Sequence, residues 1–73
     1  MPPKNYRVNR PTIALVLEGD QHVAHTVPTG AIITVQNGQP FAGDRLMDVL
    51  WGGVSVMMFT QDLRVRTTLI TDN

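Results

Sequence analysis

The sequence predicts a small all-β domain, a closed or nearly closed barrel of five to six short antiparallel strands. Short runs rich in β-branched and aliphatic residues alternate with turn-forming pairs that contain glycine or proline. Two apolar runs, LMDVLW and VSVMMF, are separated only by a pair of glycines, which favours a tight hairpin. A barrel is favoured over an open sheet because closure removes the exposed strand edges that invite aggregation.

The first half of the chain predicts three strands joined by turns. The Gly19-Asp20 pair is typical of a turn, and the triplet Pro28-Thr29-Gly30 suits another because proline fixes one negative φ and glycine tolerates a positive one. Residues 37–44 form a turn-rich connection, and a long loop of this kind is a common place for a binding surface. The strands are expected over residues 12–18, 21–27 (the weaker pattern) and 31–36.

The Gly52-Gly53 pair sets the predicted register of the central hairpin. Glycine accepts the positive φ angles of a two-residue turn, so Trp51 faces Val54 and side chains alternate between two faces. One face is apolar throughout and is expected to be the core face: Met47, Val49, Trp51, Val54, Val56 and Met58. The other face is mixed: Leu46, Asp48, Leu50, Ser55, Met57 and Phe59.

A helix over residues 45–51 is the competing interpretation. Asp44 would cap it, Gly52 would end it, and Leu46, Val49 and Leu50 would share its apolar stripe. The strand is preferred because the VSVMMF run is itself a strand pattern and needs a partner.

The end of the chain predicts a short turn and a last strand. Thr60 can cap a single 3₁₀ or α turn over residues 60–64, and residues 65–70 form the final strand. The run from Gly43 to Ile70 resembles the second half of SH3-like small barrels, in which Gly-Asp precedes a strand, a tight hairpin follows, and a 3₁₀ turn leads to a closing strand. The resemblance implies an SH3-like barrel, but such barrels include peptide binders, nucleic-acid binders, structural modules and a small reductase type, so it does not choose a function.

Two segments are expected in the domain organisation. Residues 1–11 hold three prolines, three cations and no acid, which predicts an extended basic tail. Residues 12–73 form a single small β-barrel domain.

Composition excludes several classes of protein. The chain has 73 residues, 42% of them hydrophobic, which is typical of one small folded domain rather than a disordered chain. It has no cysteine, which excludes disulfides and thiol chemistry, and the absence of a signal-peptide pattern or a membrane span leads us to expect a cytoplasmic protein. Six basic residues balance six acidic ones, so bulk charge indicates neither a nucleic-acid nor a membrane partner.

The mixed hairpin face carries the leading functional hypothesis, a non-catalytic binding or assembly module that associates with itself. Apolar patches on small soluble proteins commonly mark such contacts, and a chain this short gains stability from oligomerisation. The alternative is intramolecular cover by Tyr6, Val8 and the first predicted strand. In the self-association hypothesis, Asp48 lies at the rim or pairs with Arg64 or Arg66. The expected contact residues are Leu46, Asp48, Leu50, Met57 and Phe59.

A nucleic-acid-binding module is the second hypothesis. Arg64 and Arg66 would share one face of a strand, and the cations of the tail can extend it. The opposing interpretation, which the neutral net charge favours, pairs these arginines with Asp62 or Asp48. The expected contacts are Lys4, Arg7, Arg10, Arg64 and Arg66.

Catalysis and metal binding are not favoured. His22 and His25 would point to opposite faces of a strand, so that even with Asp20 nearby no metal site or cofactor is expected. Ser55 and Asp48 lack a motif that would expose a nucleophile beside a histidine. An oligomeric enzyme with a shared site is the third hypothesis, its ligand contacts being Thr60, Gln61 and Asp62.

Overall fold

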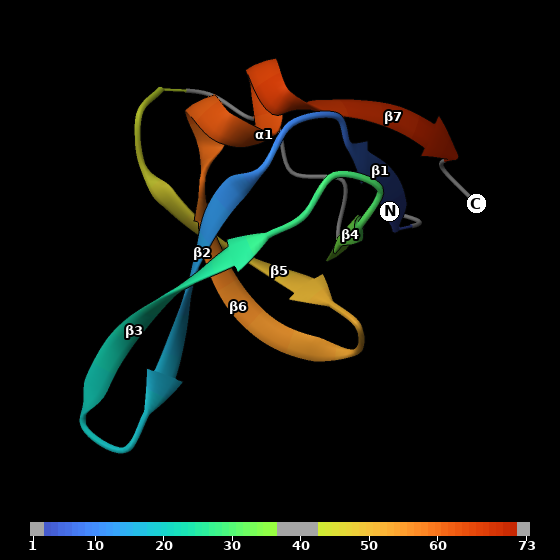
Figure 1. Cartoon of the computed structure of the whole chain (residues 1–73). Coiled ribbons are helices and arrows are strands. Elements are labelled where there is room, and N and C mark those ends of the chain that lie inside the picture. Colours follow the sequence, from blue (N-terminus) through green and yellow to red (C-terminus); the bar gives the residue numbers. More distant parts are fainter. Residues whose placement is uncertain (1–2, 37–42, 72–73) are drawn as a thin grey trace.

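A computed structural model describes residues 3–36 and 43–71, which fold into one antiparallel sheet and a short helix (Figure 1). The all-β class is confirmed. The described residues form more strands than expected, and the element before the last strand is a seven-residue α-helix rather than a 3₁₀ turn. The elements are β1 (Lys4–Val8), β2 (Thr12–Glu18), β3 (Gln21–Val27), β4 (Ile32–Val35), β5 (Leu46–Trp51), β6 (Val54–Phe59), α1 (Thr60–Arg66) and β7 (Thr67–Thr71).

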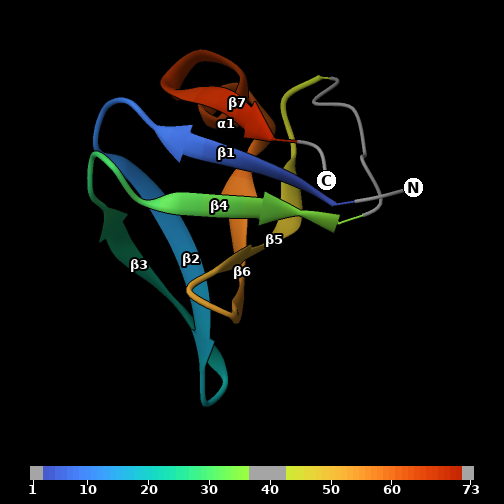
Figure 2. The same ribbon diagram turned by 90° about the vertical axis from the view of Figure 1, so that its right-hand side faces the viewer.

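The sheet curls into a half-barrel whose strand order is β3-β2-β6-β5-β4-β1-β7. Strands β3 and β7 are its two edges, so the sheet is open rather than closed. The hairpin of β2 and β3 reaches away from the rest of the molecule, and β4, β1 and β7 lie side by side at the other end of the sheet (Figures 1 and 2). The SH3-like detail of the prediction is not confirmed.

The central hairpin has the predicted register. Strands β5 and β6 pair from Leu46 opposite Phe59 to Trp51 opposite Val54, and Gly52 and Gly53 make the turn with φ angles of 60° and 80°. Residues 46–51 are therefore a strand, and the competing helix is wrong. The strand prevails because the glycine pair brings β6 alongside, where each β5 residue gains a cross-strand partner.

The core lies on the inner face of the sheet, where side chains from both halves of the chain meet. Four of the six predicted core residues of the hairpin are buried. Trp51 is only half-buried and packs against the core, while Val54 is 55% exposed, because both lie beside the turn at the end of the hairpin. The buried apolar cluster comprises Val8, Ala14, Val27, Ile33, Val35, Met47, Val49, Val56, Met58 and Leu63.

The extended conformation expected near the N-terminus holds over Lys4–Val8, but these residues are a strand inside the sheet rather than a tail. Strand β1 pairs with β4 on one side and β7 on the other. Val8 is fully buried, and its N–H donates to the carbonyl of Ala31 at 2.9 Å. Pairing along both sides and burial of Val8 hold this segment in place.

Helix α1 is longer than expected and takes Arg64, Val65 and Arg66 into its last turn. It packs Leu63 into the core, and the Thr67 hydroxyl donates to the Leu63 carbonyl at its end. Strand β7 consequently starts at Thr67 instead of residue 65. The loop surface expected at residues 37–44 lies for the most part outside the described residues.

Candidate functional site

The five residues expected to form a contact surface lie together on the outer face of the sheet. Leu46 is opposite Phe59, and Asp48 is opposite Met57. Leu46 is 38% and Phe59 44% exposed, while Leu50 and Met57 are half-buried. We call this surface, with its neighbours on β2, the outer face: Ile13, Leu15, Leu17, Leu46, Asp48, Leu50, Ser55, Met57 and Phe59.

Strand β2 extends this surface, which sequence reasoning missed. Leu15 lies opposite Met57, so the alternate residues Ile13 and Leu17 also lie on the outer face. Leu17 is 63% exposed. The TIALVLE run is apolar on both of its faces, and this was the signal that one face of the strand would stay outside the core.

An open groove of about 410 Å³ runs between β2 and the β5–β6 hairpin. Its lining is apolar, with one carboxylate, one hydroxyl and one imidazole among the side chains. The groove residues are Leu15, Leu17, His22, Asp48, Ser55, Val56 and Met57.

The alternative, intramolecular cover of this face by Tyr6, Val8 and the first predicted strand, is not what these residues provide: that strand is β2, which lies beside β6 in the same sheet. Val8 is buried in the core and Tyr6 packs against the same cluster, so both act on the inner side of the sheet. Leu17, Leu46 and Phe59 are between 38% and 63% exposed, so residues 3–36 and 43–71 leave a substantial part of each side chain open to solvent. The outer face is therefore an exposed apolar surface.

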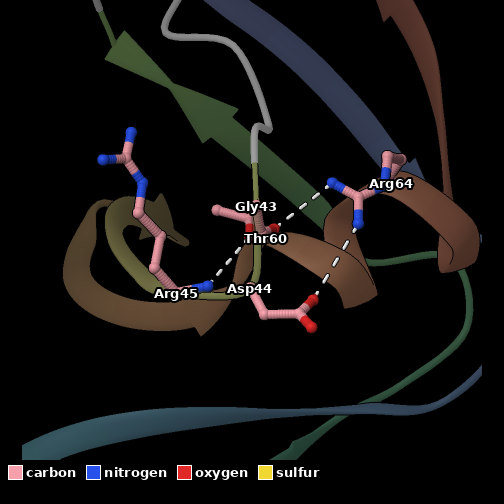
Figure 3. A network of polar contacts seen from close by, with 5 residues as sticks. All are labelled: Gly43, Asp44, Arg45, Thr60 and Arg64. Atoms are coloured by element: carbon pink, nitrogen blue, oxygen red, sulfur yellow. Dashed lines mark hydrogen bonds and ion pairs between the residues drawn. The ribbon is translucent and has the colours of Figure 1, made fainter.

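Of the two positions considered for Asp48, the pairing with Arg64 or Arg66 is wrong, because both arginines bind other groups. Arg64 lies 4.0 Å from the Asp44 carboxylate and donates to the Gly43 carbonyl at 3.4 Å (Figure 3). Arg66 lies 3.6 Å from the Asp62 carboxylate, as the opposing interpretation expected. Within the described chain, Asp48 makes no hydrogen bond or ion pair.

The candidate nucleic-acid contacts do not share one face. Arg64 and Arg66 belong to a helix, where residues two apart point about 200° from each other, rather than to a strand. Accordingly, Arg64 reaches the carbonyl of Gly43 and Arg66 reaches that of Pro11. Lys4 and Arg7 lie on β1, and Arg10 is exposed just after it.

Thr60 is a structural residue and is not open to a ligand. Its side chain is fully buried. The hydroxyl donates to the Gly43 carbonyl at 2.6 Å and accepts from the Arg45 N–H at 3.2 Å (Figure 3). The Thr60 N–H in turn donates to the Arg45 carbonyl at 2.8 Å, so this residue joins the start of β5 to the start of α1.

The polar side chains of the groove do not form a catalytic arrangement. Asp48, Ser55 and His22 line it together, yet no hydrogen bond joins any two of them in the described structure. His25 lies three residues from His22 on β3 and meets the Glu18 carboxylate at 2.8 Å instead. Residues 3–36 and 43–71 contain no cluster of three metal-ligating side chains.

Comparisons with known proteins give no relative: no family model, curated protein or solved structure matches the chain. Among the described residues, no helix has both the length and the apolar character needed to span a bilayer.

Proposed function

We propose that the chain is a non-catalytic assembly module that binds a second copy of itself through the outer face. The observation that carries the proposal is the apolar surface formed by Leu17, Leu46 and Phe59 around Met57, on which these three side chains stay between 38% and 63% exposed. Exposed apolar side chains gathered on one face of a small protein favour association, because burying them releases ordered water.

A second copy fits this surface for two reasons. A twofold contact places the same apolar residues against each other, so the surface is its own complement. It also offers the Asp48 carboxylate a donor, since His22 lies in the same groove and a copy brings a second His22 within the interface.

Sedimentation velocity over a range of concentrations tests the proposal with the variant Met57→Lys. Placing a charged ammonium at the centre of the outer face opposes burial, so the variant is expected to shift from the associated species towards smaller ones. Leu46→Lys, nearer the edge of the same face, is expected to act in the same direction.

Val65→Lys is the matched control. Val65 is 61% exposed on α1 and is not one of the outer-face residues, and the change introduces the same side chain there. Circular dichroism confirms that each variant is folded. A wild-type chain that stays monomeric at the highest concentration, or equal effects of Met57→Lys and Val65→Lys, would contradict the proposal.

A further inference from the structure

Strand β3 is an edge of the sheet, and among residues 3–36 and 43–71 no strand pairs with its outer side. It is paired to β2 alone, and the β2–β3 hairpin reaches away from the body of the molecule (Figures 1 and 2). The pairing is regular over seven residues, from Gln21 opposite Glu18 to Val27 opposite Thr12, without a bulge. The free side of β3 is therefore an uninterrupted row of backbone groups.

The register fixes which backbone groups point outward. Glu18 and Gln21 flank a two-residue turn, and residues in that position exchange both hydrogen bonds. Bonded pairs then alternate with non-bonded ones along the hairpin. His22, Ala24 and Thr26 are the non-bonded residues of β3, so their N–H and C=O groups point away from β2.

This edge lacks the features with which proteins usually block strand pairing. The QHVAHTV segment contains no lysine, proline or acidic residue. The opposite edge, β7, differs, because its pairing with β1 shifts register between Asn5 and Tyr6. Such irregularities twist an edge away from a new partner strand. Strand β3 is therefore the edge better suited to pair with a further strand.

We propose that β3 pairs antiparallel with β3 of a second copy, with Ala24 opposite Ala24 of that copy. This register places His22 opposite Thr26 of the second copy. It gives a hydrogen-bond partner to each outward N–H and C=O group of His22, Ala24 and Thr26 in both copies. Ala24 is exposed and small, so the two chains can approach at the centre of the pair. A second β3 is the natural occupant because the row of donors and acceptors is its own complement under a twofold axis.

The contact joins two sheets into one continuous sheet across the axis. The axis runs perpendicular to the sheet, so the two outer faces stay on the same side and lie next to each other. The edge contact uses backbone groups of β3, whereas the proposed outer-face contact uses side chains, those of β2, β5 and β6 together with that of His22. A result that contradicts one of the two proposed contacts therefore leaves the other untouched.

The test is sedimentation velocity of Ala24→Pro in the Met57→Lys background. Proline removes the outward N–H of residue 24, which the β2 ladder does not use, and proline is tolerated on edge strands. Ala24→Ser, which keeps the N–H, is the matched control. The Met57→Lys chain and its Ala24→Ser version are expected to be dimers, and the Ala24→Pro version is expected to have about half that mass.

Two results would overturn the edge pairing: a monomeric Met57→Lys chain, or a Met57→Lys/Ala24→Pro chain that remains dimeric. Amide hydrogen exchange on the wild-type chain keeps the test independent of whether the proline variant folds. The amides of His22, Ala24 and Thr26 are expected to exchange more slowly as protein concentration rises. Exchange at these three amides that is independent of concentration contradicts the pairing, whatever happens at the outer face.

Discussion

Leu15 of β2 lies directly opposite Met57 of β6, and this pair joins the two hairpins of the molecule into one surface. Without it, the β5–β6 hairpin would present a narrow mixed face. With it, the apolar residues of β2 extend that face, and a groove forms beside Asp48. The candidate site is thus a product of a contact between segments about 40 positions apart in the sequence.

Neighbouring methionines of β6 test which face is the core. Met58 is fully buried, whereas Met57 is half-buried on the outer face. Met58→Ala is expected to lower the free energy of unfolding by about 2–5 kcal/mol, because it removes apolar contacts and leaves a cavity. Met57→Ala is expected to cost clearly less in urea denaturation at a concentration where both chains are monomeric. Equal losses would contradict the assignment of faces.

The geometry of the glycine turn in the central hairpin predicts that the stability of the fold depends on the chirality of the residue at position 53. Gly53 has a φ of 80°, and apart from Gly53 itself and its two neighbours along the chain no atom lies within 4 Å of where a Cβ would be, so a side chain there meets only backbone strain. Gly53→Ala is expected to destabilise the fold by about 1–2 kcal/mol. A D-alanine at position 53, introduced by chemical synthesis, favours positive φ and is expected to be tolerated. Thermal unfolding distinguishes them, and an L-alanine variant as stable as the D-alanine variant would refute the turn geometry.

Thr60 connects α1 to the start of β5 through its hydroxyl (Figure 3). Thr60→Val keeps the shape of the side chain but removes both hydrogen bonds of the buried hydroxyl, to the Gly43 carbonyl and from the Arg45 N–H, and is expected to cost about 1–3 kcal/mol. Thr60→Ser keeps the hydroxyl and is expected to retain most of that stability. Urea denaturation measures both, and a valine variant more stable than the serine variant would show that these hydrogen bonds contribute little.

Burial raises the pKa of Tyr6 above its ordinary value of 10.0. The folded protein therefore resists ionisation of the phenol more than the unfolded chain does, so the contribution of Tyr6 is complete below pH 10 and is lost as the pH rises through the raised pKa. Tyr6→Phe is expected to flatten the fall in stability on the alkaline side. Chemical denaturation at a series of alkaline pH values measures it, and identical profiles for the two chains would remove this role.

The local features of the fold were predictable from the sequence because each depends on residues close together in the chain. The Gly52-Gly53 pair and the alternation of side chains between the two faces of a strand predicted the register of the central hairpin. The TIALVLE run predicted the bounds of β2. These signals also placed Leu46 and Met57 on the same outer face.

The features of the fold that were not predicted correctly depend on contacts between residues far apart in the chain. Nothing in residues 1–11 shows that β4 and β7 will pair along both sides of β1. Helix α1 packs Leu63 into the core and extends two residues beyond the predicted turn, which places Arg64 and Arg66 on a helix and separates their side chains. The sequence likewise did not predict that β2 pairs with β6, and so it did not predict the groove beside this pair.

The outer-face contact is tested most directly by isotope-filtered NOE spectroscopy on mixed labelled and unlabelled chains. The Ala24→Pro variant is used because it isolates the outer face from the edge of β3. Intermolecular NOEs are expected from the Met57 methyl group to Leu46, Leu50 and Phe59 of the second copy. A sample at millimolar concentration that shows no intermolecular NOE from Met57, or shows them only from residues such as Val65 away from the outer face, would contradict the account.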